Sequence, residues 1–142
     1  MTVRVTAAAP PQVWDVLADG WLYPVWVVGA ARVRGVDETW PAVGAKIHHS
    51  VGAWPLMLSD HTEVLESRPG EFLLLLARGW PVGEAHVSIT LTALAGNTQI
   101  EIVEDVVSGV GLLVPRPIRR RLIDVRNVET LRRLAYVAEG RR

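Results

Sequence analysis

The chain has 142 residues, of which 49% are apolar and 21% are charged, and it contains no cysteine. This length predicts a single domain over residues 1–142, with enough apolar residues to fill a core. The lack of cysteine excludes a disulfide framework, a zinc site with thiolate ligands and a cysteine nucleophile. No apolar run reaches the roughly 18 residues that span a bilayer, and the N-terminus lacks a long apolar signal segment. We therefore expect a cytoplasmic protein without stable membrane insertion.

The formal net charge is zero, but the charges are unevenly distributed along the chain. Residues 115–142 carry nine arginines and three acidic residues, whereas residues 1–114 carry six basic and twelve acidic residues. A basic segment that docks against an acidic body explains this pattern, and the alternative is a surface for phosphate, nucleic acid or an anionic membrane. Nucleic-acid binders usually combine overall basicity with interleaved aromatic residues. The basic segment has only Tyr136, so we expect no nucleic-acid partner.

The N-terminal part predicts a strand followed by two helices. Residues 2–7 (TVRVTA) alternate between apolar and polar side chains, which is typical of a strand. Residues 10–19 (PPQVWDVLAD) begin with two prolines, which suit a first helical turn, and continue with an apolar helical face. Residues 20–29 (GWLYPVWVVG) predict a short second helix or a kinked helical turn that carries Trp21 and Trp26.

From residue 31 to residue 108 the apolar period changes to two, which indicates consecutive antiparallel strands. One of them, FLLLLARGW, is apolar on both faces and should be central or covered on both sides. Turns rich in glycine and proline separate the expected strands, which are residues 31–38, 45–51, 56–66, 72–80, 81–94 and 99–108.

After Pro117 the sequence predicts one long amphipathic helix. Since no other long amphipathic element is present, we expect the curved sheet to wrap around this helix. The two short helices would then close one end, and a cavity would remain between the helix and the sheet. The residues that we assign to its apolar stripe are Ile118, Leu122, Val125, Val128, Leu131, Ala135 and Ala138.

Four stretches carry a resemblance to a known superfamily: TVRVTAAAPPQVWDVLADGWLYPVW, DHTEVLESRPGEFLLLLARG, HVSITLTALAGNTQIEIVED and RNVETLRRLAYVAE. Across residues 2–139 the chain resembles the helix-grip (SRPBCC) superfamily of START, Bet v1-like pollen-allergen and polyketide cyclase/dehydrase-like proteins. The resemblance implies an α+β helix-grip fold, a curved antiparallel sheet of about seven strands around a long C-terminal helix. Members bind lipids, sterols, polyketides or plant metabolites in a central cavity, and some catalyse aromatisation, cyclisation or dehydration. They share no catalytic motif, so the site must be argued from this chain.

Strand alternation predicts which polar side chains face the cavity. His49 belongs to the more apolar face of its strand, and Asp60 and Glu104 fall on the apolar faces of theirs. His86 falls with polar neighbours and should face solvent. A carboxylate on an apolar face needs a partner, and an arginine of the C-terminal helix, such as Arg119 or Arg120, would provide one for Glu104.

These three inward residues are the candidate catalytic residues. A histidine with a nearby carboxylate can remove a proton beside a carbonyl and protonate a leaving hydroxyl. The alternative is that His49, Asp60 and Glu104 are satisfied core groups or contacts to a ligand. A metal site from the same triad has no supporting spacing, so we expect no metal and no other cofactor.

The leading hypothesis for function is binding of a small hydrophobic or aromatic molecule, lipid-like or polyketide-like. One alternative is a polyketide cyclase/aromatase or dehydratase, and another is a stress- or chaperone-associated interaction module that uses the basic helix. We expect a monomer or a homodimer. The tryptophans of the second helical segment offer flat apolar faces that suit ring-shaped ligands. The predicted ligand-binding residues are Trp21, Trp26, Leu58, Leu74, Leu76, Ile89, Ile102 and Leu122.

Overall fold

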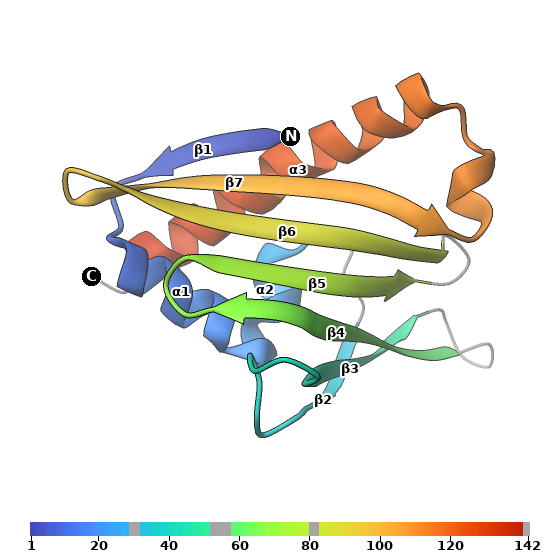
Figure 1. The fold of residues 1–142 in the computed structure, drawn as a ribbon, viewed down its shortest axis with the longest axis horizontal. Coiled ribbons are helices and arrows are strands. Elements are labelled where there is room, and N and C mark those ends of the chain that lie inside the picture. Colours follow the sequence, from blue (N-terminus) through green and yellow to red (C-terminus); the bar gives the residue numbers. More distant parts are fainter. Residues whose placement is uncertain (29–31, 52–57, 80–82, 141–142) are drawn as a thin grey trace.

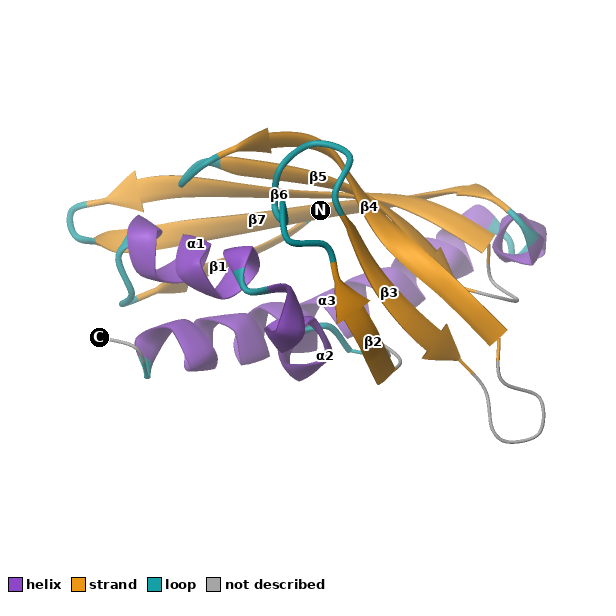
Figure 2. Ribbon diagram, turned by 90° about the horizontal axis from the view of Figure 1, so that it is seen from below, coloured by secondary structure: helices purple, strands orange, loops and turns teal. Residues whose placement is uncertain are grey.

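The computed structural model is built on a curved antiparallel sheet with helices on its concave face (Figures 1 and 2). The structure describes residues 1–28, 32–51, 58–79 and 83–140. Its strands are β1 (Thr2–Thr6), β2 (Arg32–Val36), β3 (Lys46–Val51), β4 (Leu58–Arg68), β5 (Phe72–Gly79), β6 (Gly83–Leu94) and β7 (Asn97–Ser108). Its helices are α1 (Pro10–Ala18), α2 (Tyr23–Trp26) and α3 (Arg116–Glu139), with 3-10 turns η1 (Gly20–Leu22) and η2 (Val110–Leu113).

The seven strands follow the order β1-β7-β6-β5-β4-β3-β2, and every neighbouring pair is antiparallel. The first strand therefore pairs with the last, and β5 lies at the centre, as its apolar sequence predicts. Figure 2 shows α1, α2 and α3 together on one side of the sheet. The prediction of a curved sheet around a long C-terminal helix, with two short helical segments after the first strand, is confirmed.

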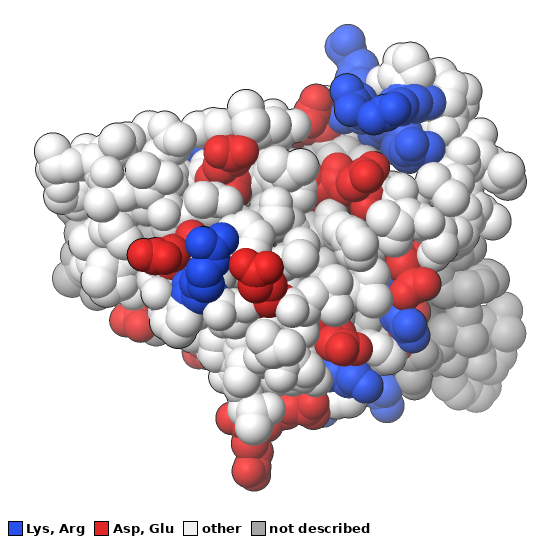
Figure 3. All heavy atoms as spheres, in the orientation of Figure 1, with Lys and Arg blue, Asp and Glu red and all other residues white. Residues whose placement is uncertain are grey.

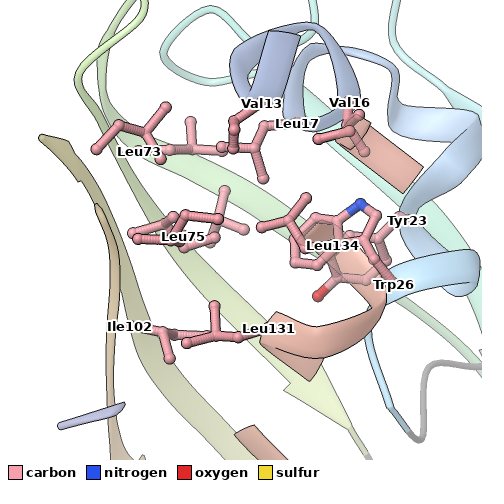
Figure 4. Close-up of a cluster of buried hydrophobic side chains, with 14 of the residues drawn as sticks. Val13, Val16, Leu17, Tyr23, Trp26, Leu73, Leu75, Ile102, Leu131 and Leu134 are labelled. Atoms are coloured by element: carbon pink, nitrogen blue, oxygen red, sulfur yellow. The ribbon is translucent and has the colours of Figure 1, made fainter. Parts of the chain in front are cut away.

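The core lies between the concave face of the sheet and the helices (Figure 4). Leu73 and Leu75 of β5 point toward α1 and α3, where they meet Leu17 and Leu134, and all four are at most 1% exposed. Fully burying a leucine contributes about 1.5–3 kcal/mol relative to leaving it exposed. These contacts hold α1 and the C-terminal half of α3 against the middle of the sheet.

Two close contacts fix the ends of elements. The indole Nε1 of Trp40 donates to the carbonyl oxygen of Leu17 at 3.1 Å, which satisfies a carbonyl that the end of α1 leaves free. Gly83 begins β6 with a φ of +108°, and a Cβ there would lie 2.0 Å from the carbonyl oxygen of Ser108. The start of β6 can therefore approach the end of β7 only because residue 83 is glycine.

The prediction for the apolar stripe of α3 is wrong in the first half of the helix. Leu131, Ala135 and Ala138 are buried, but Ile118, Leu122, Val125 and Val128 are 54–66% exposed. The reason is helical geometry. Each residue advances about 100° around the axis, so successive three-residue steps drift steadily away from the starting face. The buried side of the helix is formed by Asn127, Thr130, Leu131, Leu134, Ala135 and Ala138.

Candidate functional site

A polar cluster lies on the concave face of the sheet, where β3, β4 and β7 face α2 and α3. His49 of β3 pairs in register with Asp60 of β4, so both side chains leave the sheet on the same side. The preceding pair on that side, Ile47 and Thr62, is buried, and His49 is 6% exposed. The structure thus turns His49 and Asp60 toward the interior, as strand alternation predicts. Their catalytic role stays a prediction.

The same register turns two other histidines toward the opposite face. His48 pairs with His61 on the opposite face of β3 and β4, and the Nε2 of His48 lies 2.9 Å from the Oδ1 of Asp37. His86 is exposed, as predicted. The histidines of the chain therefore do not converge on one point, because His49 alone faces the interior.

A hydrogen-bonded chain links three elements at the cluster. The Nε2 of His49 lies 3.3 Å from the hydroxyl oxygen of Thr62, and the Thr62 side chain also bonds that of Tyr23 in α2. Burial raises the pKa of the Tyr23 hydroxyl, and the negative charge of Glu104 adds to that rise, while Thr62 and Arg126 oppose it. Tyr23 therefore keeps its proton at neutral pH and can act as a hydrogen-bond donor in the interior.

Glu104 of β7 lies on the same concave face and forms an ion pair with Arg126 of α3. The Glu104 side chain is 8% exposed and that of Arg126 is 38% exposed. An arginine of the C-terminal helix was the expected partner, but Arg119 and Arg120 were the wrong choices. Arg119 instead donates to the carbonyl oxygen of Val114 near the start of the helix. Arg126, two turns further along, is the arginine that meets Glu104.

The electrostatic environment keeps the imidazole of His49 neutral. Burial lowers the pKa of His49 below 6.5, and the positive charges of His61, Arg34 and His48 lower it further, while Asp60 raises it. A neutral imidazole has one nitrogen that can accept a proton. With Asp60 directly across the strand pair to stabilise the protonated form, His49 can serve as a general base.

Three buried polar atoms of this cluster have no hydrogen-bond partner among the described residues. They are the Nε1 of Trp26, the Nδ1 of His49 and the Nε of Arg126. The Trp26 ring meets the Tyr23 ring edge to face, with centroids 5.4 Å apart, and Figure 4 shows both rings beside Leu134. A buried polar atom without a partner costs about 1–3 kcal/mol. All three atoms lie around one Tyr23–Thr62–His49 chain.

Ser50 Oγ is also buried without a partner. Ser50 follows His49 directly along β3 and pairs with Ser59, so its side chain leaves the sheet on the other face. It therefore does not belong to the cluster.

The predicted ligand-binding residues fall into different places. Ile89 and Ile102 are 1–2% exposed and belong to the core that faces α3, and Trp26 is 3% exposed. Trp21 is 58% exposed at the surface, next to α1. The side chain of Leu58, the first residue of β4, lies outside the described part of the chain.

The assignment of Leu74, Leu76 and Leu122 to the ligand space is corrected by the structure. Leu74 pairs with Ser88 and Leu76 with His86, so both lie on the convex face of the sheet, opposite the buried Leu73 and Leu75. A strand that is apolar on both faces gives no period from which to choose the inner side. Leu122 is 62% exposed on the side of α3 that faces away from the sheet.

The sequence interpretation did not single out Tyr23, Thr62 or Arg126. A signal for Thr62 was present, because it shares the inward set of its strand with Asp60. For Arg126, the sequence feature that could have identified it is its spacing from Thr130, four residues later. Asn127 and Thr130 are polar residues on the buried side of α3, and Arg126 lies beside them. Tyr23 gave no signal beyond its place in a short apolar helix.

Two surface hollows lie away from the polar cluster. One, of about 540 Å³, is lined by Trp21, Trp40 and the carboxylates of α1, of Asp19 after it and of the segment after β2. The other, of about 650 Å³, lies at the start of α3. Within the described ranges, no group of three or more His, Asp or Glu side chains is arranged to hold a metal ion. No helix formed by the described residues is long and apolar enough to cross a membrane.

Comparison with known proteins identifies the fold. No family model and no curated protein matches the chain. Among solved structures, protein NE0264 from Nitrosomonas europaea is 14% identical with a TM-score of 0.69, over 98% of this chain and 92% of that one. The Zhui aromatase/cyclase from Streptomyces sp. R1128 is 19% identical with a TM-score of 0.63, over 98% and 92%. These likenesses confirm the helix-grip fold expected from the sequence resemblance.

A third structure is a larger protein. The di-domain aromatase/cyclase StfQ from the steffimycin biosynthetic pathway is 13% identical with a TM-score of 0.68 over 98% of this chain. The chain spans 49% of the length of StfQ, which corresponds to one half of that protein.

Proposed function

We propose that the chain binds a small aromatic or polyketide-like molecule against the polar cluster between the sheet and α3. The observation that carries the proposal is the set of buried polar atoms without partners, Trp26 Nε1, His49 Nδ1 and Arg126 Nε. Two of these are obligatory donors, since an indole and a guanidinium have no acceptor. The ligand must therefore carry acceptor oxygens on an otherwise apolar frame.

The surroundings favour flat rings in that frame. Trp26 and Tyr23 offer two perpendicular aromatic rings, and the apolar side chains of Ile102, Leu131 and Leu134 lie nearby (Figure 4). Aromatic rings pack well against aromatic and aliphatic walls, while polar atoms fix their orientation. Hydroxylated polycyclic aromatics and their poly-β-ketone precursors combine both features. The fold shared with aromatase/cyclases supports the same class of ligand by analogy.

A cyclase or dehydratase activity is the second candidate, and the neutral His49 beside Asp60 favours it. His49 would take a proton from the carbon between two carbonyls, and Asp60 would stabilise the resulting imidazolium. Protonated Tyr23 would donate to the carbonyl oxygen that gains negative charge. Glu104, which is paired with Arg126, would hold that arginine in position rather than exchange protons.

Binding can be tested with emodin, a hydroxylated anthraquinone, and with anthracene, which has the same three fused rings without oxygens. We expect emodin to bind at least about tenfold more tightly than anthracene, because only emodin satisfies the buried donors. Titration calorimetry measures both affinities. Equal affinities for the two compounds, or no binding of emodin, would contradict the proposal.

Two tryptophan variants provide matched controls. Trp26→Phe removes a buried donor and should weaken emodin binding about tenfold, whereas Trp21→Phe removes an exposed indole and should leave it unchanged. For the enzymatic alternative, His49→Gln should abolish turnover of a linear poly-β-ketone mimic, while emodin binding weakens by no more than in Trp26→Phe. Turnover that survives in His49→Gln would exclude His49 as the base.

A further inference from the structure

The first half of α3 has an apolar face that no described element covers. Its residues, which we call the outer face of α3, are Ile118, Leu122, Val125 and Val128, and they are 54%, 62%, 66% and 56% exposed. Arg126 follows Leu122 by one helical turn, lies on the flank of this face and reaches Glu104 in the interior. The helix therefore presents an apolar strip to the outside at the level where its flank meets the polar cluster.

The 3-10 turn η2 extends this apolar surface along the chain. Leu113 is 81% exposed, Val110 is 51% exposed and Leu112 is 46% exposed, all within a few residues of the start of α3. Single exposed aliphatic side chains are common, but a cluster of seven from adjacent elements marks a surface that meets an apolar phase or a partner.

Arginines without counter-ions border this surface. Arg116, Arg120 and Arg121 line the 650 Å³ hollow together with Val125, and none of the three forms an ion pair with another described residue. Asp124, the acidic residue of this hollow, is 3.8 Å from the N-terminal amine of the chain. Figure 3 shows basic side chains gathered at the upper right, where Figure 1 places the first turns of α3.

This combination of charge and apolarity limits the occupant. A second copy packed symmetrically on the same face would bring two arginine clusters together, which is electrostatically unfavourable. The exposed apolar side chains are all aliphatic, whereas the apolar residues enriched in protein-binding hot spots are tryptophan and tyrosine. Aliphatic side chains that enter the acyl layer, bordered by guanidinium groups at the level of the phosphates, are typical of interfacial amphipathic helices.

We propose that η2 and the outer face of α3 form a docking surface for an anionic phospholipid membrane. The aliphatic side chains insert below the headgroups, and Arg116, Arg120 and Arg121 pair with lipid phosphates. The helix would lie in the plane of the interface without crossing it. The docking is independent of the ligand proposed for the interior.

Vesicle co-sedimentation tests the docking. The intact protein is mixed with vesicles of phosphatidylcholine alone or of phosphatidylcholine and phosphatidylglycerol in equal parts. We expect sedimentation with the anionic vesicles only, and release when salt screens the arginines. The double variants Leu113→Ser/Leu122→Ser and Arg120→Gln/Arg121→Gln should each lower the affinity about tenfold or more. All the substituted side chains are exposed, and circular dichroism verifies that the variants fold.

Matched control variants lie elsewhere on the surface. Val43→Ser removes a 65% exposed valine between β2 and β3, and Arg32→Gln removes an exposed arginine at the opposite edge of the sheet. Both should bind anionic vesicles like the wild type. Equal sedimentation with neutral and anionic vesicles, or wild-type binding by the two double variants, would overturn the proposal. A wild-type dimer in analytical ultracentrifugation that Leu113→Ser/Leu122→Ser dissociates would also overturn it, because a second copy would then cover the face.

Discussion

The two halves of α3 differ in what they bury. The C-terminal half turns Leu131, Leu134 and Ala138 into the core, where they pack against the sheet and the short helices. The N-terminal half turns Arg126 inward and leaves Leu122 at the surface. One continuous helix thus has an apolar inner side over one half and an apolar outer side over the other.

This difference places the apolar core and the polar cluster at different positions along a single helix. The C-terminal half contributes burial, which the folded state requires. The N-terminal half keeps polar groups beside the interior cluster and apolar groups outside, an arrangement that buries little apolar surface and exposes aliphatic side chains to water. Such an arrangement is reasonable where the outer side has a partner and the inner side has a ligand.

The sharpest test of this comparison removes a leucine from each half. Leu134→Ala should lower the free energy of unfolding by about 2–5 kcal/mol, because it opens a cavity at a fully buried position. Leu122→Ala should change it by less than about 0.5 kcal/mol, because the side chain is already 62% exposed. Urea denaturation followed by circular dichroism measures both values. A large loss in Leu122→Ala would show that the outer face of α3 is covered in solution.

The next largest effect concerns the ion pair that joins α3 to β7. Arg126→Met should lower the free energy of unfolding by about 2–4 kcal/mol, because it leaves the buried carboxylate of Glu104 without its partner. Glu104→Gln should cost less, because the Arg126 side chain is 38% exposed and can reach water. Arg132→Met, which breaks an exposed pair with Glu129, is the control and should have the smallest effect. A larger loss of unfolding free energy in Glu104→Gln than in Arg126→Met would mean that the arginine is the more deeply buried partner.

The smallest effect is a pH dependence from His49. Because burial holds the pKa of His49 below 6.5 in the folded protein, the unfolded chain takes up a proton first as the pH falls. The stabilisation is fully present above pH 6.5 and is lost between pH 6.5 and the lower folded pKa. His49→Gln should flatten the dependence over this range in denaturation series at several pH values.

A buried threonine provides the control for the pH series. Thr98 donates to the carbonyl oxygen of Ala8 and does not titrate in this range. Thr98→Val should lower stability at every pH and keep the wild-type slope. An unchanged slope in His49→Gln would assign the pH dependence to other groups.

The strand pattern was predictable because burial on one face imposes a period of two. The order of elements, the central place of β5 and the inward orientation of His49, Asp60 and Glu104 all follow from that period. The irregularities do not. The bulge between Val64 and Glu66 in β4 shifts the pairing with β5, and nothing in the local residue types requires it.

The orientation of the site residues could be predicted only for those that lie on strands. Alternation gives the face of a side chain but not its partner across the core, so Glu104 was expected to pair with Arg119 or Arg120 rather than Arg126. Leu74 and Leu76 could not be oriented in a strand that is apolar throughout. For α3, apolar residues three or four positions apart were assigned to one face of the helix. Over the nine residues from Leu122 to Leu131 the helix turns by about two and a half turns, so these two leucines lie on opposite sides.

The contact between Gly83 and Ser108 has a consequence for how this sequence can vary. A side chain at position 83 would meet a backbone oxygen, which cannot move aside as the end of a flexible side chain can. The positive φ adds a second penalty for every residue with a Cβ. In a saturation-mutagenesis library selected for folded protein, position 83 should retain glycine alone, while exposed neighbours such as His86 accept many residues.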